Sequence, residues 1–163
     1  MKKIFQPQYA IWIFLANSLL FNLDKIVLGD KTLIRMHDIF ESVYADYRDY
    51  GELLFEHGLF YWFPNAAGGS PSFATHIYPY HPIAILTNFV PLWLVYTLSI
   101  IVLIWLAGYG MYVFLKQAMG YDNTLCFLGG GLFALAMSET YDDVMPSFLF
   151  NFLFPFFLAH TTY

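Results

Sequence analysis

The chain has 163 residues, of which 59% are hydrophobic, 21% aromatic and 12% charged. Soluble domains are about 45–50% apolar and about 25% charged. A soluble fold of this length would leave much apolar surface in water, so the composition predicts an integral membrane protein. The net charge of −5 argues against a nucleic-acid partner, which would require a basic patch to neutralise phosphates.

The first predicted element is a membrane span at residues 4–23, IFQPQYAIWIFLANSLLFNL. This uncharged run has the length that crosses a bilayer, about 20 residues. Two lysines precede it, and Pro7 suits the first turn of its helix. Ala16-Asn17-Ser18 loosely resembles a signal-peptide cleavage site, but the apolar run continues past this site. That continuation favours an uncleaved span.

The segment after this span, residues 24–81, is the polar part of the chain. Between residues 36 and 57, apolar side chains recur at three- and four-residue steps. This spacing predicts one or two amphipathic helices lying on the outer leaflet. Gly51 and Gly58 are expected to interrupt or end the pattern. The following stretch, residues 63–82, is rich in proline and glycine and predicts a loop.

Residues 82–115 contain no charged side chain. They are too long for one upright crossing at about 1.5 Å of rise per residue. Pro91 is predicted to divide them into a re-entrant or interfacial piece at 82–90 and a span at 92–115. Further spans are predicted at 124–137 and at 146–163. The first of these two contains three consecutive glycines, which allow close contact between helices.

Together these segments predict an all-α integral membrane protein, a multi-span helical bundle with an extracytoplasmic loop of amphipathic helices after the first span. All residues, 1–163, are assigned to one membrane domain. The chain ends inside an apolar run, so it is expected to be the amino-terminal part of a longer protein. Basic residues near span ends set the orientation. Placing Lys2, Lys3 and Lys116 on the cytoplasmic side predicts a multi-pass protein of the cell membrane, with a cytoplasmic amino terminus and residues 24–81 outside.

Candidate site residues lie in the external loop. Asp38 and Glu41 are three residues apart and share a helix face. A carboxylate there could accept a proton or bind a metal, but the spacing alone favours the ordinary solvated face of an amphipathic helix. Gly68-Gly69 would let backbone amides approach a phosphate, although most such pairs only turn the chain. His76 and His81 are candidate ligands or proton carriers that lack the regular spacing of a zinc site.

A second acidic group follows the third predicted span, in the stretch SETYDDVM. Its members Glu139, Asp142 and Asp143 could join Asp38 around a divalent cation, because hard cations take oxygen ligands. The commoner alternative is a polar loop that marks the membrane edge. No cofactor is firmly indicated by the sequence, and a divalent cation is the one candidate.

Five motifs follow one another along the chain. They are MHDIF (36–40), NAAGGSPSF (65–73), IYPYHP (77–82), AGYGMYVFLKQAMG (107–120) and GGGLFALAMS (129–138). Each motif is degenerate, so their order and spacing carry the comparison. In this order the chain resembles the GT-C superfamily of membrane glycosyltransferases, and most closely the YfhO-type bacterial membrane proteins.

The resemblance implies an enzyme that transfers a sugar from a polyprenyl-phosphate donor to a cell-envelope acceptor on the extracytoplasmic face. It also implies that a carboxylate in the first external loop acts as base, and Asp38 is the matching position. Such a carboxylate takes the proton of the acceptor hydroxyl as the hydroxyl attacks the anomeric carbon. The leaving phosphate is an anion and requires cationic or amide partners. The substrate-binding candidates are Arg35, Glu41, Arg48, Gly69, His76, Tyr78 and Tyr80.

Two other functional classes stay open. A non-catalytic transporter or flippase would place ionisable residues at mid-membrane depth. Here those residues cluster in the external loops, which favours the enzyme, with the lipid-linked donor and membrane lipid as its partners. A structural or assembly subunit would instead leave Asp38 pointing into bulk water without a groove beside it. Whether the fragment is active alone is open as well.

Overall fold

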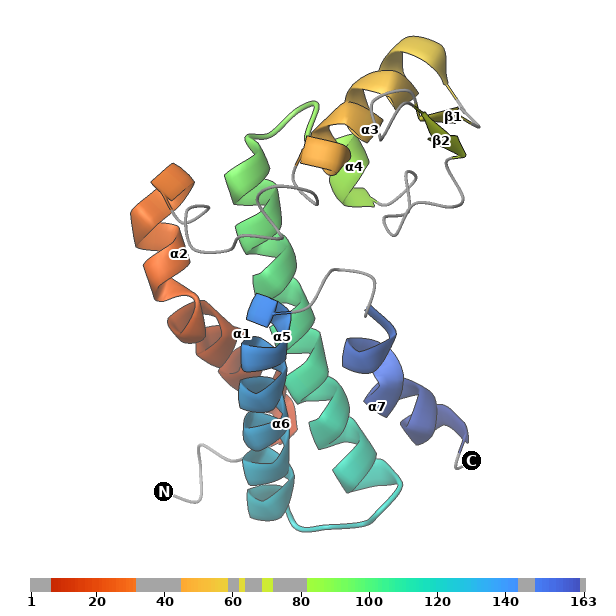
Figure 1. Cartoon of the computed structure of the whole chain (residues 1–163). Helices are drawn as coiled ribbons and strands as arrows, with labels where there is room; N and C mark the ends of the chain where they lie inside the picture. The colour runs from red at the N-terminus through yellow and green to blue at the C-terminus, as the bar shows by residue number, and fades with distance from the viewer. Residues whose placement is uncertain are drawn as a thin grey trace. The chain divides into compact units, whose positions relative to one another are not determined.

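The computed structural model describes residues 7–31, 45–58, 62–63, 69–71, 82–143 and 149–161. The described residues are mainly helical (Figure 1), which confirms the all-α expectation. The exception is a small antiparallel ladder, in which Trp62 of β1 (Trp62–Phe63) pairs with Pro71 of β2 (Ser70–Pro71). The chain divides into two compact units. We call them the apolar unit (Met1–Val27, Ile100–Val144, Phe148–Tyr163) and the polar unit (Leu28–Ser99, Met145–Ser147).

The apolar unit begins with the uncharged amino-terminal run. A 3-10 turn, η1 (Pro7–Tyr9), leads into α1 (Ala10–Phe21), which is followed by α2 (Leu23–Leu28). Proline is tolerated at such an entry because the first N–H groups of a helix have no intrahelical partner. Asn22 separates the two helices, and its Nδ2 donates a hydrogen bond to Ser18 O at 2.9 Å.

A tight connection joins the next two helices, α5 (Leu92–Gln117) and α6 (Asn123–Asp143). Gly120 turns the chain with a φ of 69°, a left-handed conformation that glycine adopts without steric cost. Asp122 then caps α6, because its Oδ1 accepts hydrogen bonds from the backbone N–H groups of Thr124 and Leu125 at 2.8 and 3.2 Å. The cap satisfies donors that the first helical turn leaves without a partner.

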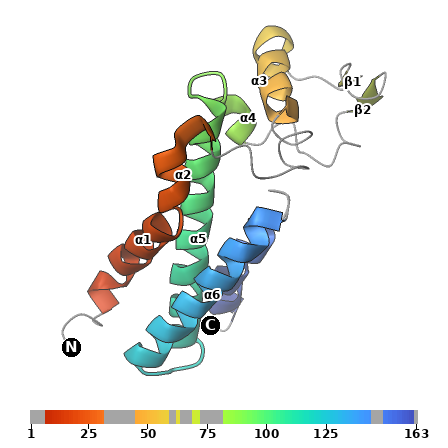
Figure 2. The ribbon, with the colours of Figure 1, turned by 60° about the vertical axis from the view of Figure 1, so that its left-hand side comes forward.

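A cluster of buried aromatic rings joins α1, α5 and α6. Phe14, Tyr112 and Phe127 lie with their ring centroids 4.9 to 6.0 Å apart. Ala10 and Cys126 complete the buried cluster. Figure 1 and Figure 2 show α1 and α6 running alongside α5. The core of the apolar unit therefore lies where these three helices meet.

The glycine run of α6 provides a close helix contact at two of its three positions, as the sequence predicts. A Cβ atom at Gly130 would lie 2.6 Å from both the carbonyl oxygen of Gly108 and a ring carbon of Phe14. A Cβ atom at Gly129 would meet a leucine side chain of α5, whereas one at Gly131 would meet no atom from another described part of the chain within 4 Å. Gly130 thus permits an approach between helices that a side chain would block.

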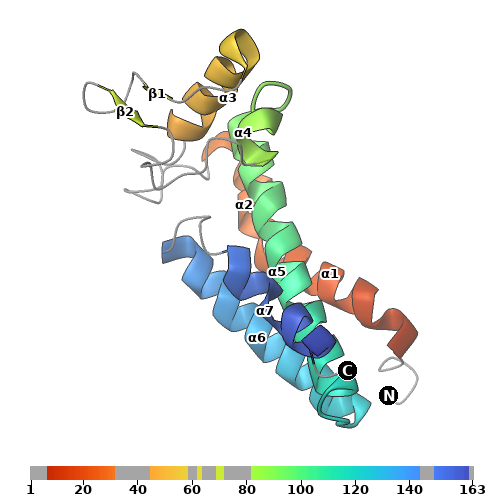
Figure 3. The same ribbon diagram turned by 90° about the vertical axis from the view of Figure 1, so that its right-hand side faces the viewer.

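The last helix, α7 (Leu149–Thr161), contains Pro155 in its interior. Its Phe156 ring lies 6.0 Å from the Tyr109 ring of α5. A Cβ atom at Gly110 would lie 2.6 Å from that same phenylalanine ring, so α7 also packs on α5 across a glycine. Figure 3 shows α7 beside α5.

The polar unit contains α3 (Ala45–His57) and α4 (Pro82–Leu86), together with the first residues of α5. Gly51 lies inside α3 and neither interrupts nor ends it, so the expectation for this residue was wrong. Gly58 does end the helix, with a φ of 71° and a hydrogen bond from its N–H to Leu54 O. Pro91 separates α4 from α5, as the sequence predicts.

Among the described residues, α5 is the one helix that is long and apolar enough to cross a membrane by itself. The segments Pro7–Phe21 and Leu23–Lys31 would count as a second candidate if they formed one span, although they are bent by 55°. The apolar part of α6, Asn123–Ser138, is shorter. Length and composition therefore assign α5 as the candidate span.

Replacing Gly51 with valine is expected to force α3 away from α4. A Cβ atom at Gly51 would meet the carbonyl oxygen of Ala84, and it would lie 2.8 Å from Thr87 Oγ1. A backbone carbonyl cannot rotate away, so overpacking should cost about 1–3 kcal/mol of folding stability. The midpoint of thermal unfolding, followed by circular dichroism in detergent, should fall by several degrees relative to Glu56→Val, which alters an exposed position of the same helix. Equal midpoints for the two variants would contradict this contact.

Candidate functional site

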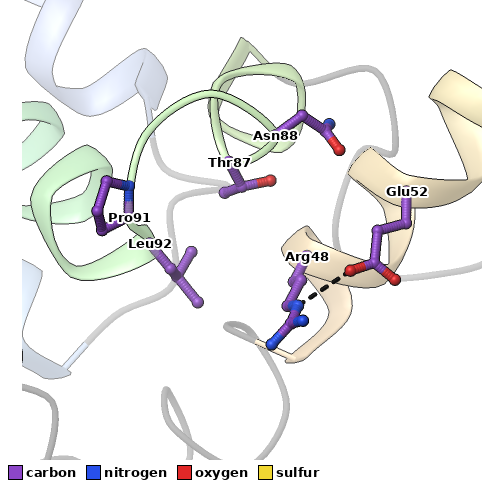
Figure 4. Close-up of a pocket in the computed structure, with 6 residues that line it drawn as sticks. All are labelled: Arg48, Glu52, Thr87, Asn88, Pro91 and Leu92. Carbon is purple, nitrogen blue, oxygen red and sulfur yellow. Dashed lines mark hydrogen bonds and ion pairs between the residues drawn. The ribbon is translucent and has the colours of Figure 1, made fainter.

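A cavity of about 330 Å³ lies in the polar unit (Figure 4). Three elements line it: α3 supplies Arg48 and Glu52, the turn after α4 supplies Thr87 and Asn88, and the start of α5 supplies Pro91 and Leu92. Small-molecule sites have volumes of about 300–1,000 Å³. The cavity is therefore at the small end of that range, sufficient for a headgroup rather than an entire lipid.

The charged wall of the cavity is an ion pair on one face of α3. Arg48 and Glu52 are four residues apart, and Arg48 Nε donates to Glu52 Oε1 at 3.0 Å (Figure 4). Exposed pairs of this spacing contribute only about 0.3–0.5 kcal/mol to stability, so the pair orients the guanidinium more than it stabilises the fold. Within the described residues, no acceptor contacts the two terminal nitrogens of Arg48.

The opposite wall is a turn held by side-chain hydrogen bonds. Thr87 Oγ1 donates to Ala84 O at 2.7 Å. Asn88 Nδ2 donates to Ala84 O and Ile85 O, each at 3.4 Å. These bonds satisfy carbonyl groups that the end of α4 leaves without helical partners. The turn therefore places a hydroxyl and an amide across from the ion pair.

The third wall is apolar and belongs to the first turn of α5. The backbone N–H groups of Leu94 and Val95 donate to Pro91 O at 2.9 and 3.1 Å, so Pro91 leads directly into the helix. Proline fits this place because it lacks the N–H that a helix start would leave unpaired. The apolar wall of the cavity thus lies at the beginning of the candidate span, at Pro91 and Leu92.

The cavity contains one of the residues that the sequence assigns to substrate binding, Arg48. A second, Gly69, lies beside β2 with a φ of 108°, and a Cβ atom there would lie 2.5 Å from the Trp62 indole. Close packing against Trp62 is sufficient reason for a glycine at this position. The other loop residues of the predicted site lie outside the described residues: Asp38, Arg35, Glu41, His76, Tyr78 and Tyr80.

The predicted cation site receives no support from the described part of the chain. Glu139 and Asp142 belong to α6, but their side chains, like Asp38, lie outside the described residues. Among the residues that are described, no group of three or more His, Cys, Asp or Glu side chains could hold a metal ion. The divalent cation stays a prediction from the sequence.

Sequence reasoning did not assign the other five residues of the cavity wall to a site: Glu52, Thr87, Asn88, Pro91 and Leu92. The four-residue spacing of Arg48 and Glu52 was a usable signal for the first of them. No periodic pattern marked Thr87 and Asn88, because they lie in a turn and reach the cavity only through the packing of α4 on α3.

In comparisons with known proteins, the chain matches no protein family, no curated protein and no solved structure.

Proposed function

We propose that the protein is a multi-pass membrane glycosyltransferase, or the amino-terminal part of one. In this proposal it transfers a sugar from a polyprenyl-phosphate donor to a cell-envelope acceptor on the extracytoplasmic face. The observation that carries the proposal is the Arg48 cavity at the start of the candidate span. The sequence motifs that resemble the GT-C superfamily supply the reaction.

The distribution of side chains in the apolar unit supports several membrane crossings. Large apolar residues face outward: Trp12 is 66% exposed and Leu132 is 68% exposed. Four leucines of α6 form one exposed stripe, at positions 125, 128, 132 and 135. Ser18 and Ala134 are buried beside the aromatic core. The outward-facing apolar surface would be unfavourable in water, and the small and polar contacts inside are expected where lipid surrounds the helices.

The contacts between these helices are also of the kind that membrane bundles use. Ser18 Oγ donates to Ile101 O at 2.5 Å, and Trp105 Nε1 donates to Ile11 O at 2.9 Å. Gly108 and Gly130 bring α5 and α6 together without intervening side chains. Since apolar burial does not drive helix association in lipid, small residues and interhelical hydrogen bonds take that role. These contacts support the proposal that α1, α5 and α6 lie within the bilayer, and the proposal extends to α7, which packs on α5 across Gly110.

The chemistry of the cavity fits the headgroup of a lipid-linked donor. A polyprenyl phosphate joins an anion to a long hydrocarbon chain, so its site requires a cation next to an apolar exit. Arg48 supplies the cation, and Pro91 and Leu92 form the apolar edge. Because Glu52 engages Nε, the two terminal nitrogens of Arg48 are oriented for the paired hydrogen bonds that guanidinium makes with phosphate. Asp38 stays the proposed base for the acceptor hydroxyl.

Sugar transfer in proteoliposomes tests this proposal. The wild-type protein should move radiolabelled sugar from a polyprenyl-phosphate donor to an acceptor extracted from the cell envelope. Arg48→Gln should lower kcat/KM for the donor by about 10- to 100-fold, since a hydrogen bond to a charged group contributes about 1.5–3 kcal/mol. Lys31→Gln, which removes an exposed cation from the same unit, should change it less than twofold.

Two results would count against this assignment in different ways. Transfer that requires a nucleotide sugar, with polyprenyl-phosphate sugars inactive, would overturn the donor class. Equal donor kinetics for Arg48→Gln and Lys31→Gln would remove Arg48 from the donor site while leaving the reaction in place.

A further inference from the structure

The polar unit carries an exposed pair of aromatic side chains outside the cavity. Phe55 of α3 and Phe89 of the turn before α5 lie edge to face, with ring centroids 5.3 Å apart and an interplanar angle of 73°. Phe55 is 59% exposed and Phe89 is 68% exposed. Two phenylalanines that contact each other and remain this exposed form a surface that favours an apolar or interfacial environment over bulk water.

The fold of the unit explains why these rings meet. α3 and α4 approach most closely at Gly51, and Phe55 lies one helical turn further along α3. The backbone N–H of Phe89 donates to Leu86 O at 3.0 Å, which keeps the turn close to the end of α4. Ile85 and Leu86 are also exposed. We call the four residues Phe55, Ile85, Leu86 and Phe89 the aromatic patch.

The aromatic patch lies close in sequence to the candidate span, and this position indicates that the patch contacts lipid. Phe89 precedes Leu92, the first residue of the candidate span, by three residues. Three residues extend at most about 11 Å, so the Cα atom of Phe89 lies within that distance of the first residue of α5. Helices that lie at the membrane interface bury phenylalanine and leucine side chains at the boundary between headgroups and acyl chains. The patch is therefore continuous with the part of the chain that enters the bilayer.

We propose that the aromatic patch inserts into the headgroup region of the outer leaflet and holds the polar unit against phospholipid. This inference rests on the membrane location in the proposed function. Glu56 and His57 lie about 100° and 200° around α3 from Phe55. Their polar side chains are 71% and 65% exposed, and the proposal leaves them in water. Because α3, the turn after α4 and the start of α5 line the cavity, insertion of the patch holds Arg48 at the depth of the lipid phosphates.

Depth-dependent fluorescence quenching tests the insertion. In a Cys126→Ala background, which removes the single cysteine, Phe55→Cys and Phe89→Cys are each labelled with a nitrobenzoxadiazole fluorophore and reconstituted in phosphatidylcholine vesicles. Quenching by a headgroup nitroxide lipid should be at least twofold stronger at both positions than at Glu56→Cys, the water-facing control on α3. Val102→Cys, in α5 and exposed, should be quenched most strongly by a nitroxide deep in the acyl chain.

Each pattern of quenching supports or overturns the inference. Strong headgroup quenching at positions 55 and 89, with little at 56, supports it. Equal quenching at 55, 56 and 89 while 102 is quenched from the acyl region overturns it, and the patch would then face a protein or a second copy. Absence of acyl-region quenching at 102 overturns the membrane location itself, and the insertion with it.

Discussion

Replacing Gly130 with leucine is expected to prevent the apolar unit from assembling, whereas the same change at Gly131 leaves it intact. A Cβ atom at Gly130 would lie 2.6 Å from Gly108 O and from Phe14 Cζ. The ring of Phe14 is enclosed by Tyr112 and Phe127, and the carbonyl belongs to a helix backbone. Neither neighbour can move aside, so the cost should reach or exceed the upper end of the about 1–3 kcal/mol typical of overpacking.

Gly131 provides a matched control within the same helix. A Cβ atom there would meet no atom of another element within 4 Å among the residues that the structure describes, and leucine is a better helix former than glycine by up to about 1 kcal/mol. Gly131→Leu should therefore retain the wild-type yield of monodisperse protein in detergent and its thermal midpoint. Gly130→Leu should lose most of the yield and lower the midpoint of what remains by about 5–10 °C. The same midpoint and yield for the two variants would show that α6 does not pack on α5 through Gly130.

The difference between Gly130 and Gly131 shows which part of the helix contact the sequence predicts. Three consecutive small residues predict a close contact, but not which of them makes it. The helical period decides this, because Phe127, Gly130 and Ala134 recur at three- and four-residue steps on one face. Phe127 and Ala134 are buried, and Gly131 is turned about 100° from Gly130 around the helix. The face could have been read from the sequence once Phe127 was taken as a core residue.

The first helix illustrates a boundary that the sequence did not predict. The charges of Asp24 and Lys25 suggested that the first span ends at residue 23, yet helical structure resumes at Leu23 and α2 runs to Leu28. The break lies at Asn22, whose side chain donates to Ser18 O. Asparagine competes in this way with the helix for backbone partners. Asn22, a buried polar residue with 1% exposure, therefore ends α1, whereas the charged residues Asp24 and Lys25 lie within α2.

In the cavity, one wall follows from residue spacing along the sequence, and the other depends on how the helices pack. Arg48 and Glu52 are visible from their spacing on one helix, since residues four apart are neighbours on its surface. The turn that faces them is positioned by the approach of α3 to α4 at Gly51, which no local pattern encodes. The sequence thus predicts the charged wall of the site but cannot predict which residues oppose it.

Asp38→Asn is expected to abolish sugar transfer while leaving donor binding unchanged. Asparagine has the size of aspartate but cannot accept a proton from the acceptor hydroxyl, and a general base contributes about 10²- to 10⁴-fold to the rate. The measured kcat should fall by that factor with the KM for the donor unaltered. Asp30→Asn makes the same chemical change at an exposed residue of the same unit and should retain wild-type transfer.

The two variants of the polar unit, at Asp38 and Arg48, should therefore fail in different ways. Loss of the base removes an interaction that acts on the acceptor in the transition state, so kcat and kcat/KM fall together. Loss of the Arg48 cation weakens the hold on the donor phosphate, so a large part of its effect appears as a higher KM for the donor. Wild-type transfer by Asp38→Asn would exclude this carboxylate as the base. A raised donor KM in that variant would instead place Asp38 with Arg48 in the donor site.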